Sequence, residues 1–185
     1  MSGVQGYLDA KRTAMRAQRT RVASGEAAPK RVSAQVNVEG RAGVRRVRVR
    51  DFQFLTDSGP ETGGFDLGPS PVEVLLGALG GCLAHTIVVQ AALRGVPLDA
   101  LSVDVSATVD PRAGHPAHPD VPVHPREIAY VARIDSPADE ATVRALLDAA
   151  ERVCPVTALL TEPQEVTGSL AYRHSGAAAE PVAAD

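Results

Sequence analysis

Apolar and polar residues alternate in five stretches of the chain, a period that predicts strands with one buried face. Two of them, Val32–Val38 and Val44–Arg50, are joined by a short connection with glycine at two positions, which favours a hairpin. Three more stretches follow later in the chain: Leu101–Val109, Glu127–Ile134 and Glu165–Tyr172. The pattern therefore predicts a sheet assembled from antiparallel strands.

The segment Val74–Leu93 is different, because it is apolar without alternation. Ser70 precedes it as a candidate N-cap, a proline takes the first helical position, and Glu73 stands three residues after the serine, which together make a capping box. Gly95 is a natural residue to follow a helix C-terminus. These signals predict a helix over Ser70–Arg94. It is long enough to cross a bilayer, but its polar and glycine residues favour a core helix and no membrane contact.

Three further helices are predicted. One covers about Val4–Arg21, a second begins after Asp139 and runs to about Val153, and a short third follows Pro155. Helices and antiparallel strands mixed in this way indicate an α+β fold.

Composition limits the number of domains and the class of protein. The chain has 185 residues, of which 44% are hydrophobic and 22% charged, as is typical of one soluble globular domain. We assign that domain to residues 32–174 and expect residues 175–185, which are rich in alanine, to be disordered.

Residues 1–31 form a basic arm and linker with a net charge of +5. The domain behind the arm is acidic, and no nucleic-acid-binding motif is present. We therefore expect a solvated helix that packs on the domain or on a partner subunit, rather than a nucleic-acid ligand.

The chain has two cysteines, Cys82 within the apolar segment and Cys154 directly before Pro155. Two cysteines do not make a secreted disulfide scaffold, and the N-terminus lacks a signal peptide, so we expect a cytoplasmic protein. The start of a helix after Pro155 favours the thiolate form of Cys154. For Cys82, a redox function and simple packing as a small apolar residue both remain open.

Histidines supply the other candidate chemistry. His85 lies one turn after Cys82, but two ligands are too few for zinc, and a core histidine is the favoured interpretation. His115, His118 and His124 lie in a proline-rich loop with irregular spacing, which favours a solvated loop. We expect neither a metal nor a cofactor.

Two motifs together resemble the OsmC/Ohr family, whose names refer to osmotic induction and organic hydroperoxide resistance. The stretch Gly68–Cys82, which reads GPSPVEVLLGALGGC, followed by the Arg94-Gly95 pair, resembles the central motif of that family. The later Val153-Cys154-Pro155-Val156 is similar to its second cysteine motif. The resemblance covers roughly residues 32–173. It implies an antiparallel sheet packed on long central helices, with two chains intertwined as a homodimer.

The resemblance also implies an activity, the reduction of organic hydroperoxides. By this likeness Cys82 is the peroxidatic thiolate, which becomes a sulfenic acid, and Cys154 resolves it as a Cys82–Cys154 disulfide. A dithiol reductant, either a lipoylated protein or a thioredoxin-like protein, then reopens the bond. Arg41, in the predicted hairpin turn, matches the family arginine that stabilises the thiolate.

One position departs from the family pattern. The peroxidases have a catalytic glutamate directly after the proline of the first motif, where this chain has Val72. Glu73 is one residue later, about 100° around the helix, and a capping role explains it without catalysis. The pattern resembles a divergent OsmC-like branch. Two functions stay open: a thiol peroxidase that uses Cys82, Cys154, Arg41 and Glu73, or a noncatalytic protein that binds a small apolar ligand at the dimer interface.

Overall fold

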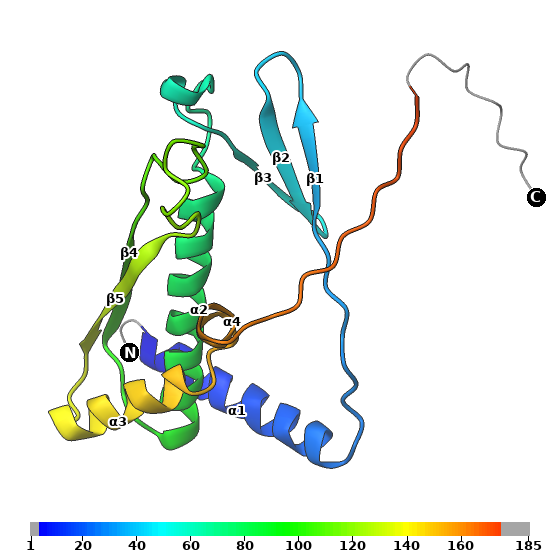
Figure 1. Cartoon of the computed structure of the whole chain (residues 1–185). Coiled ribbons are helices and arrows are strands. Elements are labelled where there is room, and N and C mark those ends of the chain that lie inside the picture. The colour runs from blue at the N-terminus through cyan, green and yellow to red at the C-terminus, as the bar shows by residue number, and fades with distance from the viewer. Residues whose placement is uncertain (1–3, 175–185) are drawn as a thin grey trace, which may run out of the picture.

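Helix α2, Pro71–Arg94, is the element on which most of the others pack (Figure 1). The computed structural model describes residues 4–174. Ser70 Oγ accepts a hydrogen bond from the Glu73 N–H at 3.3 Å, and the Ser70 N–H donates to Glu73 Oε2 at 2.7 Å. Gly95 closes the other end in the left-handed conformation, with φ of 72°. The predicted helix and its two end signals are therefore confirmed.

Strands β4, Ala100–Thr108, and β5, Arg126–Asp135, form an antiparallel pair that covers one side of α2 (Figure 1). Their inward residues alternate as predicted, and Val105 lies opposite Tyr130 in the register. The helix approaches β4 closely at Gly80, where an added Cβ would lie 3.1 Å from Val105 Cγ2. A side chain at this position would therefore fit only if Val105 shifted by a few tenths of an ångström.

Two helices complete this part of the molecule. Helix α3, Glu140–Glu151, begins at Asp139, whose carboxylate accepts a hydrogen bond from the Thr142 N–H at 2.8 Å. Helix α4, Pro155–Thr161, follows after a three-residue connection. The main buried cluster joins α2, α3 and the connection between α2 and β4, and it contains the fully buried residues Ile87, Leu98, Leu146 and Ala150.

Helix α1, Val4–Ala23, packs its first half against α2. Leu8 is fully buried in the main cluster, and Arg12 Nε donates to the Ala92 carbonyl at 2.7 Å. The second half is exposed and extends away from α2 (Figure 1). The basic arm is thus a helix that packs on the domain, as expected.

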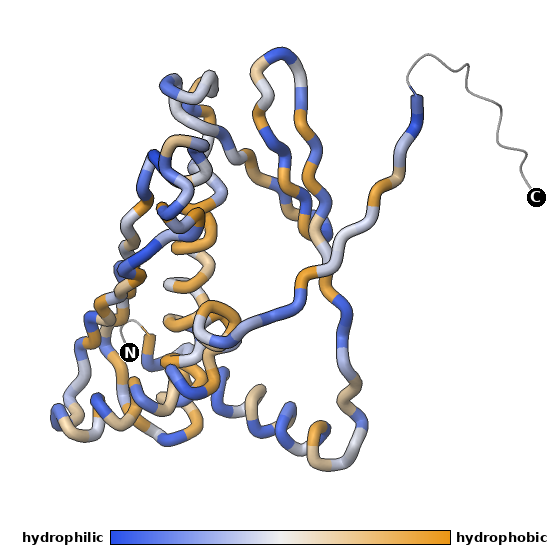
Figure 2. The backbone as a smooth tube through the Cα atoms, in the orientation of Figure 1, coloured by the Kyte–Doolittle hydropathy of each residue, from blue (hydrophilic) through white to orange (hydrophobic). Residues whose placement is uncertain are grey.

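Strands β1, Gln35–Glu39, β2, Val44–Val49, and β3, Phe52–Thr56, form a separate antiparallel sheet in the order β1-β2-β3. This hairpin sheet stands apart from the middle of α2 (Figure 1). Apolar and polar positions alternate along its strands (Figure 2). Its register places one row of apolar residues across the sheet: Val36, Val47 and Phe54.

The predicted strand Glu165–Tyr172 is wrong for the single chain. Within the described residues this segment is extended but pairs with no strand, and Val166, Leu170 and Tyr172 are 92%, 87% and 76% exposed. The alternation is present, but a strand also needs a neighbour for its N–H and C=O groups. The tail 175–185 lies outside the described residues.

Candidate thiol site

The structure brings the two cysteines together. Cys82 lies in the middle of α2 and Cys154 at the start of α4, and they belong to one buried cluster with Leu79 and Leu83. Both are free thiols, and each is close enough to influence the ionisation of the other. Cys154 is only 1% exposed, whereas Cys82 is half-buried.

The chain positions Cys154 through the tight connection between α3 and α4. The Cys154 N–H donates to the Glu151 carbonyl at 3.1 Å, and the Cys154 carbonyl accepts from the Ala158 N–H at 3.0 Å. Cys154 is therefore the N-cap residue of α4, and Pro155 takes the first helical position, where its missing N–H leaves no bond unmade. Both ends of the cysteine backbone are fixed by helices.

The Cys154 thiol is the more acidic of the two. Burial opposes its ionisation, but the neighbouring Thr157 hydroxyl, the Thr157 and Val156 N–H groups and the Cys82 thiol all favour the thiolate and together outweigh that effect. Together these lower the pKa of Cys154 below that of an ordinary cysteine. The prediction that the α4 start favours the Cys154 thiolate agrees with this arrangement.

The pKa of the Cys82 thiol is shifted in the opposite direction. Burial is the main cause that raises its pKa, and the neighbouring Cys154 raises it further, while the Val156 N–H only partly compensates. No cationic side chain contributes to this balance among residues 4–174. In the single chain, burial and the neighbouring Cys154 therefore disfavour the thiolate form of Cys82.

Tyr130 and Glu151 border the pair on the β5 side. The Tyr130 hydroxyl donates to Glu151 Oε1. Burial, this hydrogen bond and the nearby acidic groups raise the pKa of Tyr130. Tyr130 lies within the predicted strand Glu127–Ile134, but no motif indicated its contact with Glu151. A cavity of about 160 Å³ adjoins this position, lined by Leu79, Ile128, Tyr130, Thr157, Leu160 and Thr161.

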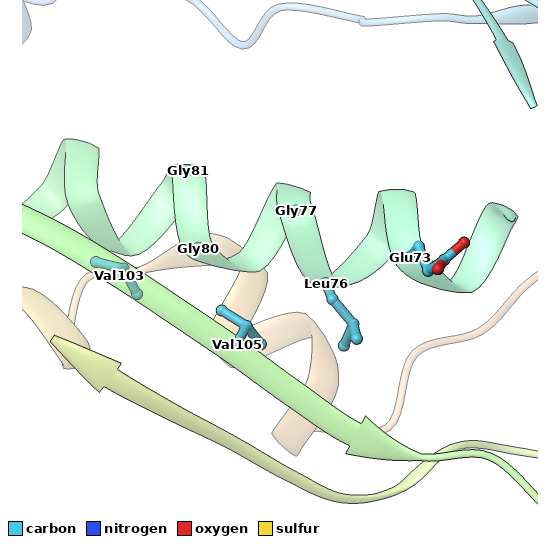
Figure 3. A pocket seen from close by; sticks show the side chains of 7 residues that line it. All are labelled: Glu73, Leu76, Gly77, Gly80, Gly81, Val103 and Val105. Carbon is cyan, nitrogen blue, oxygen red and sulfur yellow. The ribbon is translucent and has the colours of Figure 1, made fainter. Parts of the chain in front are cut away.

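Glu73 acts as a helix cap. Its carboxylate accepts from the Ser70 N–H and interacts with the Ser70 hydroxyl, and these bonds lower its pKa. It is nine residues before Cys82, about 13 Å along the helix axis. Glu73 also borders a cavity of about 290 Å³ between α2 and β4, where Gly77, Gly80 and Gly81 leave room above Val103 and Val105 (Figure 3).

Arg41 is not brought to the thiol pair within one chain. It is exposed in the turn between β1 and β2, and it is not among the groups that shift the pKa of either cysteine. The neighbouring Arg46 is held by Glu39 through two hydrogen bonds of 2.6 and 2.8 Å. The four predicted site residues therefore fall into one pair in contact, Cys82 and Cys154, and two separate positions.

His85 is exposed, so the expectation of a core histidine is wrong for the single chain. It lines a cavity of about 430 Å³ between α1 and α2 together with Tyr7 and Val88. Partial burial, and to a lesser extent the charge of Lys11, lower its pKa. In the described part of the chain, no group of three or more His, Cys, Asp or Glu residues is placed to hold a metal ion.

Helix α2 is the one helix between residues 4 and 174 that is long and apolar enough to span a bilayer. The core helix of a soluble protein meets the same criteria, and α2 contacts α1, α3, α4 and β4.

Comparison with known proteins identifies the fold. The family described as OsmC-like protein matches residues 63–168, more than half of the chain. An OsmC-like protein from Mycoplasma pneumoniae has a similar structure with a TM-score of 0.62 at 20% identity, covering 72% of this chain and 89% of that one. No curated protein matches the sequence.

Two further solved structures carry functional names. An organic hydroperoxide resistance protein OsmC from Legionella pneumophila matches with a TM-score of 0.52 at 18% identity, covering 73% of this chain and 92% of that one. The organic hydroperoxide resistance protein OhrB of Bacillus subtilis matches with a TM-score of 0.51 at 17% identity, covering 72% and 93%. At these identities the likeness establishes the fold.

Proposed function

Because this chain belongs to the OsmC-like family, we propose that it is a thiol-dependent peroxidase that reduces organic hydroperoxides. The observation that carries the proposal is the buried contact between Cys82 and Cys154, which lie 72 positions apart in sequence. Relatives with the same fold are named for organic hydroperoxide resistance, and that family includes cysteine peroxidases.

The proposed reaction has three steps. The Cys82 thiolate attacks one oxygen of the hydroperoxide, the O–O bond breaks, an alcohol leaves, and Cys82 becomes a sulfenic acid. The Cys154 thiolate then attacks the Cys82 sulfur, and water leaves as the disulfide forms. A dithiol reductant, from a lipoylated or thioredoxin-like protein, reduces the disulfide and is itself oxidised.

The first step requires Cys82 to lose its proton, which the single chain disfavours. We propose that a second copy supplies the missing cation as Arg41 of the partner subunit. The apolar face of the hairpin sheet supports a dimer, since Val36, Val38, Phe52 and Phe54 are 56%, 72%, 67% and 42% exposed. Helix α2 is also only partly covered in the single chain, with 8 of its 24 residues buried. An intertwined homodimer would cover both surfaces.

Two observations favour the alternative function, a noncatalytic protein that binds a small apolar ligand. The pKa of Cys82 is raised, and Val72 occupies the position of the family glutamate, so the groups described in residues 4–174 disfavour the thiolate that would attack a peroxide. In this alternative, the ligand binds at the dimer interface and the cysteines are packing residues.

The deciding experiment is peroxide consumption. The protein is incubated with cumene hydroperoxide and either dihydrolipoamide or thioredoxin, and peroxide loss is followed. We expect turnover with at least one reductant, no turnover in Cys82→Ser, and a single turnover followed by overoxidation of Cys82 in Cys154→Ser. Equal, slow consumption by the wild type and Cys82→Ser would favour the noncatalytic alternative.

Arg41→Ala tests the proposed role of the partner subunit. We expect a slower first step and a higher pKa of Cys82, because a nearby positive charge is removed. Arg48→Ala is a matched control, since Arg48 lies on the polar face of the same hairpin sheet. An equal effect of the two substitutions would argue against a specific role for Arg41.

A further inference from the structure

Two buried side-chain oxygens in residues 4–174 have no hydrogen-bond partner, Asp57 Oδ1 and Thr157 Oγ1. The other oxygen of Asp57 accepts from the Phe65 and Leu67 N–H groups, each at 3.1 Å, so that carboxylate already organises its loop. Thr157 has no comparable bond. A buried hydroxyl without a partner is costly, which makes its surroundings informative.

Several other helical threonines bond to a carbonyl of their own helix. The Thr161 hydroxyl donates to the Thr157 carbonyl at 3.0 Å, and the Thr86 hydroxyl donates to the Leu83 carbonyl at 3.0 Å. This is the usual local solution for threonine in a helix. Thr157 instead lies one turn after Cys154, where its hydroxyl and its N–H both favour the thiolate form of the cysteine.

We propose that Thr157 is a positioning residue that holds the Cys154 sulfur as the leaving thiolate when a dithiol opens the Cys82–Cys154 disulfide, so that the dithiol bonds to Cys82. This inference rests on the proposed function for the existence of the disulfide. It goes beyond that function by naming Cys82 Sγ as the sulfur that the reductant attacks and Thr157 as the side chain that stabilises the leaving thiolate.

The disulfide is reduced in two thiol–disulfide exchange steps. A thiolate of the reductant attacks Cys82 Sγ, a new sulfur–sulfur bond forms there, and the Cys82–Cys154 bond breaks with its electron pair on Cys154 Sγ. The second thiol of the reductant, once deprotonated, attacks the reductant sulfur that is bonded to Cys82. Cys82 is released as a thiolate. The reductant leaves as a disulfide, and both cysteines are reduced.

The difference in exposure between the two cysteines favours attack of the reductant on Cys82. Cys82 is half-buried, whereas Cys154 is 1% exposed. Tyr130 and Leu79 pack in the cluster that encloses Cys154. A reductant sulfur therefore reaches Cys82 more readily, and Cys154 is the sulfur that must depart.

Electrostatics explain why the leaving sulfur needs Thr157. The titratable groups that face Cys154 are Cys82, Tyr130 and, around the tyrosine, Glu151 and Asp148. None of these is a cation, so the developing thiolate depends on hydrogen-bond donors. The Thr157 hydroxyl has no hydrogen-bond partner, so it is free to donate when negative charge appears on the sulfur.

The test starts from the disulfide and avoids peroxide. Oxidised protein is prepared with dithiodipyridine, and its reduction by dihydrolipoamide is followed by stopped flow. We expect Thr157→Val to slow reduction about tenfold, because a hydrogen bond to a charged group is lost without a change of shape. Thr157→Ser should stay near the wild-type rate, and the exposed Thr161→Val is a matched control that should leave it unchanged.

Two further readouts separate this role from a structural one. Titration of thiolate absorbance in the Cys82→Ser background should give a higher pKa for Cys154 in Thr157→Val. When the disulfide is opened with excess glutathione and alkylated, peptide mass spectrometry should find glutathione on Cys82 and the alkyl group on Cys154.

Glutathione found mainly on Cys154, or an unchanged reduction rate in Thr157→Val, would overturn the inference. Failure of the disulfide to form with dithiodipyridine would overturn it as well. Loss of peroxide turnover with normal opening of the disulfide at Cys82 would instead contradict the peroxidase proposal and leave the role of Thr157 supported.

Discussion

The body formed by α2, α3, α4, β4 and β5 differs from the hairpin sheet in how far its apolar residues are buried. The body buries Leu83, Ile87 and Leu146 completely. The hairpin sheet leaves Val38 and Phe52 exposed by 72% and 67%, although its strands alternate just as regularly. The same alternation therefore yields a closed core in one region and an exposed apolar surface in the other, which the proposed dimer would cover.

The largest expected effect lies in the body. Leu83 is fully buried beside Cys154, so Leu83→Ala removes apolar contacts and leaves a cavity. We expect it to lower the free energy of unfolding by about 2–5 kcal/mol in urea titrations. Val38→Ala in the hairpin sheet is the control and should change the stability of the isolated chain much less. Equal losses would show that the two regions do not differ in burial.

The next effect concerns association. Val36→Asp places a charge on the exposed apolar face of the hairpin sheet, and we expect it to weaken dimerisation by about 2 kcal/mol in sedimentation experiments. Asn37→Asp adds the same charge on the opposite face and should leave association unchanged. A wild-type protein that is monomeric at micromolar concentration would contradict the proposed dimer.

A smaller effect is expected at the start of α2. Ser70→Ala removes the N-cap and should cost about 1 kcal/mol of unfolding free energy. Glu73→Gln retains the capping box and should change neither stability nor peroxidase rate appreciably. A large loss of rate in Glu73→Gln with unchanged stability would assign Glu73 to catalysis.

The smallest expected effect is a pH dependence of stability that arises from Asp57, the residue directly after β3. Hydrogen bonds from the Ser58, Leu67 and Phe65 N–H groups lower the pKa of Asp57. Its stabilising contribution is therefore present above the ordinary aspartate pKa, near pH 4, and is lost as the pH falls through the lower folded value. Thermal unfolding of Asp57→Asn should depend less on pH below about pH 4 than that of the wild type.

The sequence predicted best the features whose causes are local. The bounds of α2 follow from Ser70, Glu73 and Gly95, all adjacent to the helix they define. The strand at Glu165–Tyr172 was predicted wrongly because alternation does not reveal whether a neighbouring strand exists. The contact of Cys82 with Cys154 followed from the family resemblance, since spacing alone cannot place residues on different helices together.

Two elements of the site carried no sequence signal. The hydrogen bond between Tyr130 and Glu151 joins β5 to α3 and depends on how those elements pack. The unpartnered hydroxyl of Thr157 is visible only when all hydrogen bonds around it are known. Both depend on tertiary contacts that a one-dimensional pattern does not contain.

The contact between α2 and α4 also has a consequence for the unfolded chain. A bond between Cys82 and Cys154 would close a loop of 72 residues and so restrict the conformations open to the denatured protein. The loop-closure entropy amounts to about 4 kcal/mol. The melting temperature of the protein would then report its oxidation state, and each catalytic cycle would pass through a form that resists unfolding more strongly than the form that meets the peroxide.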